Sequence, residues 1–180
     1  MSRQIIPYQP IDLAEPKNLV EAIRKRRGGQ LINLDRMLLH SAPFAMGWNA
    51  FLKEVRENLT LHPKLKEIGM CGVAILNEAE YEFFHHAPEF IKAGGTQSQA
   101  DEFRKINTPS FNRNLFSPLE LDALDLTVQM TKNIKVDEAL IERLQKQLGN
   151  QATVELIGVI ATYNMVSRFL IALGVTPESH

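Results

Sequence analysis

Hydrophobic residues recur three or four positions apart along most of the chain, which is the spacing that places them on one face of an α-helix. Between about Lys64 and Leu76, the apolar residues Leu65, Ile68, Val73 and Leu76 are spaced so that they share one face of a helix. No segment shows the strict alternation of apolar and polar residues that is typical of a half-buried strand. The sequence therefore predicts an all-α fold.

A second helix is predicted directly after the first, and the Gly94-Gly95 pair is expected to end it. Asn77 stands at a natural N-cap position, and the first turn beyond it is rich in glutamate, which suits the positive end of the helix dipole. Glu82 and His86 are four residues apart and therefore share one face of this predicted helix. A carboxylate beside an imidazole, on a helix that also carries several phenylalanines, is a candidate proton-transfer pair.

Further helices are predicted on both sides of this central pair. They cover Lys17–Arg27, a stretch capped by Asn33, a helix from Pro43, a short helix from Ser98 to about Ile106, a helix from Ser117 to about Lys132, a helix from Val136 to Gly149, and Asn150–Leu173. Ser98 with Asp101 resembles a capping box, and Ser117-Pro118 combines a cap with a proline at the first helical position. The last helix is mostly apolar, so it is expected to be buried within the domain or between subunits.

Outside the central helices, three features have mainly structural interpretations. The apolar residues Phe44, Trp48, Phe51, Leu52 and Val55 are spaced as a core face. The basic run at positions 24–27 is expected to be a solvated helix end rather than an anion site. His40 is expected to be a hydrogen-bonded polar group near a turn, and residues 1–15 an extended arm.

Composition places the chain among ordinary globular proteins. Its 180 residues are 44% hydrophobic and 23% charged, enough for one domain with a substantial core. A net charge of −1 gives no reason to expect nucleic acid or an acidic membrane surface as partner. Without a signal-peptide pattern or an apolar run long enough to span a membrane, the expected location is cytoplasmic. Cys71 is the only cysteine, which excludes an intramolecular disulfide.

The central region contains, in order, Glu67, Ala74-Ile75-Leu76-Asn77, Tyr81-Glu82-Phe83-Phe84-His85-His86 and Ala93-Gly94. This order resembles the carboxymuconolactone decarboxylase family, which includes the AhpD-like alkylhydroperoxidase proteins. Residues 27–41 and 162–169 resemble flanking parts of longer members, so the resemblance extends from about residue 27 to 177. It implies a multihelical AhpD-like bundle over residues 27–180, preceded by an arm and short helix at 1–26, and a homodimer, trimer or hexamer.

The chain departs from the AhpD-like pattern at its reactive positions. AhpD-like members carry a glutamate, a C-x-x-C pair that opens a helix, and a histidine four residues after the second cysteine. The resemblance places the glutamate at Glu67, the cysteines at Ala79 and Glu82, and the histidine at His86. Because both thiols are absent, the peroxidase chemistry of that pair has no nucleophile here. Cys71 lies eight residues before the first of these positions and is expected to be a buried structural thiol.

The decarboxylating branch of the family resembles this arrangement, since it lacks the cysteine pair and needs no cofactor. The hypothesis assigns His86 as the proton shuttle, Glu82 as its partner and Glu67 as a second acid or orienting group, acting on a small carboxylic acid or lactone. Tyr81, His85 and Phe83 are expected to contact the substrate. Peroxidase activity of the AhpD type and non-catalytic binding of a small acid remain alternatives.

A purely structural role is an alternative to the catalytic role proposed for Glu82 and His86. A glutamate and a histidine four residues apart also stabilise a helix, by about 0.2–0.5 kcal/mol. Metal binding is considered because carboxylates and imidazoles are ligand types, but the segment lacks the second histidine one turn away that makes H-E-x-x-H specific. No metal, cofactor, nucleic acid or membrane partner is therefore expected; the expected partners are a small-molecule substrate and further copies of the chain.

Overall fold

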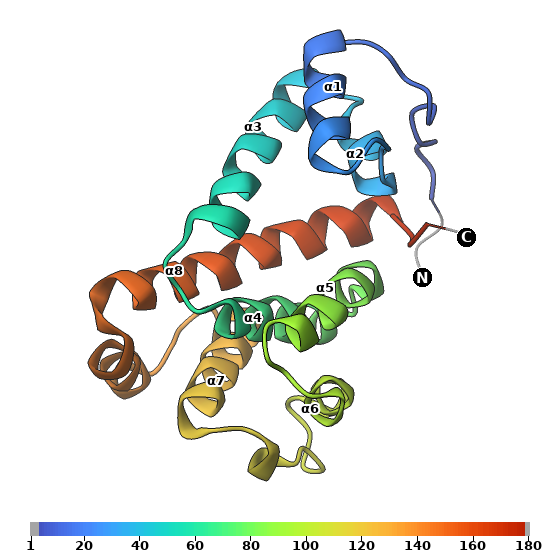
Figure 1. Cartoon of the computed structure of the whole chain (residues 1–180). Coiled ribbons are helices and arrows are strands. Elements are labelled where there is room, and N and C mark those ends of the chain that lie inside the picture. Colours follow the sequence, from blue (N-terminus) through green and yellow to red (C-terminus); the bar gives the residue numbers. More distant parts are fainter. Residues whose placement is uncertain (1–3, 179–180) are drawn as a thin grey trace. The chain divides into compact units, whose positions relative to one another are not determined.

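The structure, a computed structural model, describes residues 4–178, and no strand occurs among them. Figure 1 shows the helices: α1 Lys17–Arg26, α2 Asn33–Leu38, α3 Ala42–Lys53, α4 Pro63–Leu76, α5 Glu80–Lys92, α6 Gln97–Glu102, α7 Pro118–Lys132 and α8 Glu138–Leu173. Short helical turns cover Glu54–Asn58, Phe103–Lys105 and Arg113–Leu115. The prediction of an all-α fold is confirmed.

The chain forms two compact units. Among the described residues, one unit comprises residues 4–58 together with residues 170–178, and the other comprises Leu59–Phe169. The first unit contains α1, α2, α3 and the end of α8, and the second contains α4 to α7 and most of α8. All of the predicted site residues lie in the second unit.

In the first unit, the basic end of α1 surrounds a buried carboxylate. Asp35 is 1% exposed and accepts hydrogen bonds from the Arg27 Nε at 3.0 Å and the Ile32 N–H at 3.4 Å. Arg26 lies 3.5 Å from the same carboxylate. Part of the basic run is therefore structural rather than solvated, because a buried carboxylate requires opposite charges and donors. Ile32, not Asn33, is the N-cap of α2.

His40 is hydrogen-bonded, as expected, and its partners lie in the N-terminal arm. The His40 Nε2 lies 2.7 Å from the Pro7 carbonyl and its Nδ1 lies 3.1 Å from the Gln9 side chain. The Arg36 Nε donates to the Gln9 carbonyl at 2.6 Å. The arm is thus fastened at Pro7 and Gln9 to α2 and His40 of its own chain by hydrogen bonds, while residues 1–3 of the predicted arm lie outside the described residues.

The predicted core face of α3 is only partly correct. Trp48, Leu52 and Val55 are buried, but Phe44 and Phe51 are 48% and 49% exposed. The spacing of three and four residues correctly predicted the burial of Trp48, Leu52 and Val55. The two phenylalanines lie on a second side of the helix, which the unit does not cover. This helix is therefore apolar on more of its circumference than its own core can bury.

In the second unit, α4 is the central element and packs against both α5 and α7. Most of its residues are buried, including Gly69 and Gly72. A Cβ atom built on Gly72 would lie 2.9 Å from the Thr127 methyl group, so the glycine permits the close approach of α4 and α7. The absence of a side chain there determines how closely these two helices pack.

The helix starts show one confirmed and one wrong capping prediction. Ser117 and Glu120 form the expected capping box at the start of α7. At α6 the box is formed by Thr96 and Gln99, not by Ser98 and Asp101. The two candidate pairs are two residues apart in a polar stretch, so composition alone did not distinguish them.

The helix α8 contains the predicted boundary at Gly149, where φ is 76° and ψ is 171°. By length and hydropathy alone α8 could cross a membrane, contrary to the expectation that no stretch reaches that length. This is weak evidence, because core helices pass the same test, and 44% of the apolar window is buried in the protein. The expectation of full burial is wrong at Val154 and Met165, which are 68% and 41% exposed.

Glu120 provides a test of the packing between α4 and α7. Its carboxylate lies 2.6 Å from the Lys64 Nζ and accepts the Ser117 N–H at 2.8 Å. Burial raises the pKa of Glu120, but the Lys64 ammonium and the Ser117 N–H and hydroxyl outweigh burial and leave that pKa lowered. We expect Glu120→Gln to lower the free energy of unfolding by about 1–2 kcal/mol at neutral pH.

The sign of the pH dependence follows from the lowered pKa of Glu120. The stabilisation is present above the unfolded-state pKa and is lost as the pH falls through the lower folded-state value. Urea unfolding of wild type and Glu120→Gln should therefore differ at neutral pH and converge in acid. Glu142→Gln, at an exposed position on α8, is the control. An equal difference between wild type and Glu120→Gln at both pH values would contradict this account.

Candidate proton-transfer site

The site is built where α4 turns into α5. Asn77 is the C-cap of α4, Glu78 has a φ of 58°, and Ala79 is the N-cap of α5. The prediction that Asn77 caps α5 is wrong, and Glu78 lies outside that helix. The Asn77 side-chain amide instead donates to the Asn164 Oδ1 and the Ser167 Oγ, each at 3.0 Å. These bonds fasten the turn to α8, because both acceptors lie on that helix.

The short turn brings Glu67 of α4 against His86 of α5. The Glu67 Oε2 lies 2.8 Å from the His86 Nδ1, and the two side chains are 15% and 14% exposed. A carboxylate accepts hydrogen bonds, so Nδ1 carries the proton in this pair and Nε2 is the ring atom that can exchange a proton with another molecule. The structure thus pairs two of the predicted catalytic residues across a helix interface.

Tyr163, which the site hypothesis did not include, also contacts His86. The Tyr163 ring meets the imidazole edge to face, with a centroid distance of 4.9 Å and an interplanar angle of 85°. Tyr163 is fully buried on α8. It lies within the segment 162–169 that resembles the closing helix of the family, but nothing in that resemblance indicated contact with His86. The aromatic ring restricts the orientation of the imidazole.

Glu82 belongs to the same cluster as Glu67. It is 3% exposed, in the first turn of α5. Both carboxylates act on the Cys71 thiol: burial raises the pKa of Cys71 well above its ordinary value, and the negative charges of Glu67 and then Glu82 raise it further. Glu67, Glu82 and Cys71 therefore lie near one another, although the sequence separates them by up to fifteen positions.

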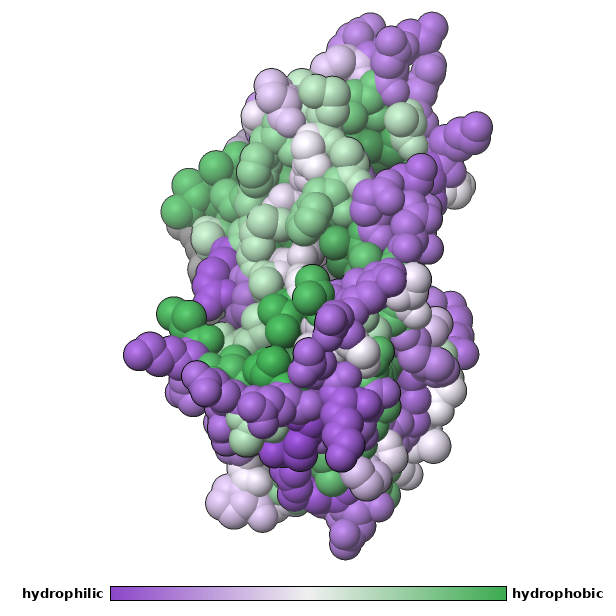
Figure 2. All heavy atoms as spheres, turned by 90° about the vertical axis from the view of Figure 1, so that its left-hand side faces the viewer, coloured by the Kyte–Doolittle hydropathy of each residue, from purple (hydrophilic) through white to green (hydrophobic). Residues whose placement is uncertain are grey.

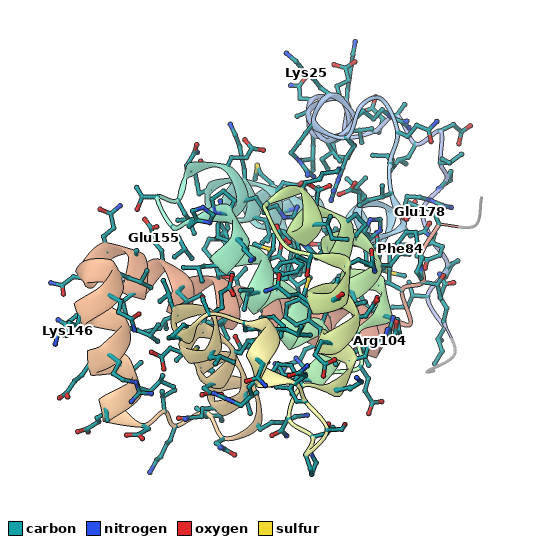
Figure 3. All side chains as sticks on the ribbon, turned by 60° about the horizontal axis from the view of Figure 1, so that its bottom comes forward. Lys25, Phe84, Arg104, Lys146, Glu155 and Glu178 are labelled. Carbon is teal, nitrogen blue, oxygen red and sulfur yellow. The ribbon has the colours of Figure 1, made fainter. Side chains whose placement is uncertain are left out.

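Tyr81 and His85 lie together on a neighbouring side of α5. Their ring centroids are 4.6 Å apart, and the Phe84 ring meets His85 edge-on at 5.2 Å. Successive residues on a helix are separated by about 100°, so this side differs from the one that carries Glu82 and His86. Phe84 is 49% exposed and points outward from α5 (Figure 3).

Phe83, the third residue expected to contact a substrate, is involved in structural contacts. It is 8% exposed, and the Arg104 guanidinium lies 4.6 Å from its ring centroid. Arg104 also makes two hydrogen bonds to the Glu80 carboxylate, at 3.0 and 3.2 Å (Figure 3 labels Arg104). Phe83 thus packs under a surface ion pair, and its expected contact with a substrate stays a prediction.

Two kinds of chemistry find little support in the cluster. Within residues 4–178, no group of three or more histidine, cysteine, aspartate or glutamate side chains is arranged to hold a metal ion. Cys71 is a buried thiol whose raised pKa disfavours the reactive thiolate. A hydrogen-bonded carboxylate and imidazole such as Glu67 and His86 can hold and move a proton.

Cys71 gives a direct test of this electrostatic description. Because burial and two carboxylates raise the pKa of its thiol, we expect a thiol reagent to label the native chain slower than the unfolded chain by a factor of about 10³ or more. Labelling rates with and without denaturant, measured by mass spectrometry at a pH near 8, check this. Rapid labelling of the native chain would contradict the burial of Cys71.

Comparisons with known proteins support the fold. No family model matches the chain, and no curated protein matches its sequence. An uncharacterized peroxidase-related protein from Silicibacter sp. TM1040 matches in structure with a TM-score of 0.79 and 16% identity, over 99% of this chain and 96% of that one.

A second solved structure is described as an alkylhydroperoxidase AhpD core, an uncharacterized peroxidase-related protein from Ralstonia eutropha JMP134. It matches with a TM-score of 0.79 and 17% identity, over 96% of this chain and 92% of that chain. At such low identity the likeness concerns the fold alone. The chain therefore has an AhpD-like all-α fold.

Proposed function

We propose that this protein catalyses cofactor-independent proton transfer on a small carboxylic acid or lactone, with decarboxylation as the reaction type. The observation that carries the proposal is the 2.8 Å hydrogen bond between Glu67 and His86, held between two helices of an AhpD-like fold. A glutamate that orients an imidazole and stabilises its protonated form is a general acid–base arrangement. The His86 and Glu67 side chains are 14% and 15% exposed, so neither is fully sealed from solvent.

In the proposed reaction, the bond between the substrate carbon and its carboxylate breaks and carbon dioxide leaves. The electron pair stays on the substrate, delocalised into the adjacent carbonyl or lactone group. The His86 Nε2 delivers a proton to the carbon, while Glu67 holds the ring through Nδ1 and stabilises the imidazolium before transfer. Water restores the proton to His86, which closes the cycle without any redox change.

Glu82 is proposed as a second acid in this cluster. It occupies the position at which the resemblance to AhpD-like proteins places the second cysteine, in the first turn of α5. Its burial beside Glu67 and Cys71 places another titratable group near the reacting proton. Tyr81 and His85 are proposed to contact the substrate, since they line the adjacent side of α5.

Peroxidase activity is the main alternative, because both structural neighbours are described as peroxidase-related. Reduction of a hydroperoxide to an alcohol and water consumes two electrons, which a dithiol supplies by becoming a disulfide. This chain has one cysteine, and its pKa is raised. The second thiol and the thiolate are both lacking, so the proton-transfer proposal fits the residues better.

A substrate screen tests the proposal. Purified protein is incubated with small lactones that carry a carboxylate, β-keto acids and unsaturated carboxylic acids, and products are followed by mass spectrometry and carbon dioxide release. We expect conversion of at least one such acid without added metal or thiol. Organic hydroperoxides with a dithiol reductant are tested in parallel, and rapid peroxide consumption without turnover of any acid would overturn the proposal.

The same screen separates catalysis from simple binding. A non-catalytic small-acid binder would give ligand-detected NMR signals for one of the acids but leave its concentration unchanged over hours. Conversion of that acid supports the enzyme, and saturable binding without conversion contradicts it.

A further inference from the structure

The first unit contains a groove between α1 and α3 with a volume of about 650 Å³. One of its sides is formed by residues of α1 at positions i, i+3, i+4 and i+7, namely Leu19, Ala22, Ile23 and Arg26. The other side is formed by residues of α3 at the same spacing, namely Met46, Asn49, Ala50 and Lys53. Each helix thus turns one face toward the groove over a length of about 10 Å.

Most of the groove surface is apolar. Ile23 is 1% exposed and also belongs to the core of the unit. Ala22 and Ala50 are exposed, one on each helix, and their small side chains keep the space between the helices open. Met46 is 60% exposed, and its flexible side chain can adapt to an apolar ligand. A concave, mostly apolar site of about 300–1,000 Å³ is typical of pockets that bind small molecules.

Positive charge adjoins this apolar surface where the two helices end. Lys25 and Arg26 lie in the last turn of α1, and Lys53 lies in the last turn of α3. All three line the groove, and Glu57 is the one carboxylate among the described residues that line it. Figure 2 shows such a mixture on this unit, in the upper half of the view, where hydrophilic residues border a hydrophobic area. The groove therefore suits a ligand that is apolar along its length and negatively charged at one end.

Arg26 joins the two sides of the groove and shows that positive charge is in excess there. Its Nη2 donates to the Asn49 Oδ1 at 2.5 Å, which links α1 to α3. Burial lowers the pKa of Arg26, and the positive charges of Arg27 and Arg56 lower it further. Nearby carboxylates act in the opposite direction without cancelling this effect. An anion at this end of the groove is therefore attracted by several positive charges.

We propose that this groove binds a medium-chain aliphatic carboxylate, with its alkyl chain between α1 and α3 and its carboxylate beside Lys25 and Lys53. The apolar sides account for the alkyl chain, and the ammonium groups account for the carboxylate. Among the described residues that line the groove, none has an aromatic ring on which a planar ligand could stack. The chemical complementarity is thus to a flexible chain with one charged end.

This binding site is separate from the proposed reaction. All residues that line the groove belong to the first unit, whereas Glu67 and His86 belong to the second. The described lining residues include no histidine or cysteine that could act on a bound ligand, so the carboxylate is bound and released unchanged. Binding at this groove can therefore be measured without any turnover.

NMR titration of the isotope-labelled chain with decanoate, octanoate and hexanoate, each below its micelle concentration, tests the proposal. We expect saturable changes in the amide signals of residues 19–26 and 46–57. Affinity should rise about two- to four-fold for each CH₂ group added to the chain, because each buries further apolar surface. Octanol has the chain of octanoate without the charge, and it should bind about 5-fold or more weakly than octanoate.

Two substitutions separate the apolar contribution from the charged one. Ala50→Trp fills the groove and should weaken decanoate binding about 10-fold or more, whereas Lys53→Gln removes one charge and should weaken it about 3- to 10-fold without changing octanol binding. Both positions are exposed, so the fold is expected to persist, which circular dichroism checks. Ala139→Trp and Lys146→Gln, at exposed positions of α8, are the matched controls and should leave both affinities unchanged.

Three results would overturn the proposal. The first is the absence of saturable decanoate binding, which is the result expected if another polypeptide chain fills the groove. The second is wild-type affinity in both Ala50→Trp and Lys53→Gln. The third is a set of signal changes confined to α4 and α5, which would place the acid at the Glu67–His86 pair and leave the proposed function standing. Conversely, a failed substrate screen would leave binding at the groove unaffected.

Discussion

Replacing His86 with glutamine is expected to lower turnover of the acid identified by the substrate screen by roughly 10²–10⁴-fold. Glutamine can keep a hydrogen bond to Glu67 but cannot carry the transferred proton. Glu67→Gln is expected to lower turnover as well. The Glu67 carboxylate lies 2.8 Å from the His86 Nδ1, and a neutral amide in its place would no longer stabilise the positive charge of the imidazolium. Both rates are measured as carbon dioxide release at saturating substrate.

Two variants serve as controls for these rates. Glu89→Gln removes a carboxylate of α5 that pairs with Lys92 on the surface, and it should leave turnover unchanged. His85→Gln removes the neighbouring imidazole, and it should raise KM more than it lowers kcat, because His85 is proposed to contact the substrate rather than to move the proton. Wild-type rates in both His86→Gln and Glu67→Gln would remove the pair from the mechanism.

Gly95→Ala is expected to be strongly destabilising, by about 1–3 kcal/mol. A Cβ atom at this position would lie only 2.2 Å from an atom of the Phe90 ring. Phe90 is fully buried and meets Phe103 edge to face at 5.0 Å, so its ring has no free space to move into. Thermal unfolding should show the loss as a drop of roughly 2–4 °C per kcal/mol.

Gly158→Ala is the matched control for this prediction. Gly158 lies within α8, and nothing surrounds the position that a Cβ atom would occupy. Alanine should therefore stabilise the helix by up to about 1 kcal/mol, because it is the better helix former. Equal effects of the two substitutions would show that helix propensity, rather than the contact with Phe90, determines the result.

Local signals in the sequence predicted most of the helices. The Ser117-Pro118 start of α7 and the Gly94-Gly95 end of α5 were correct because capping depends on a few adjacent residues. Asn77 misled for the same reason: an asparagine before a glutamate-rich stretch suits an N-cap, but tertiary bonds to α8 use its amide instead. Long-range contacts of this kind leave no local pattern.

In the candidate site, too, local spacing identified some residues, whereas the contacts between them became known only from the structure. Spacing along α5 identified Glu82 and His86, and only the family resemblance identified Glu67, which is nineteen positions before His86. That Glu67 holds the imidazole follows from the packing of α4 on α5, which periodicity does not determine. The contact between Tyr163 and His86 joins residues that are 77 positions apart, and no sequence spacing indicated it.

The connection between α4 and α5 consists of residues 77–79, and one of these, Glu78, has a positive φ. One added or deleted residue in this connection would rotate α5 by about 100° and carry the imidazole away from the carboxylate. Surface connections usually accept changes in length, but this one should not. Distant relatives that share the chemistry should then be recognisable by the constant number of residues between their glutamate and histidine, even where little else in their sequences agrees.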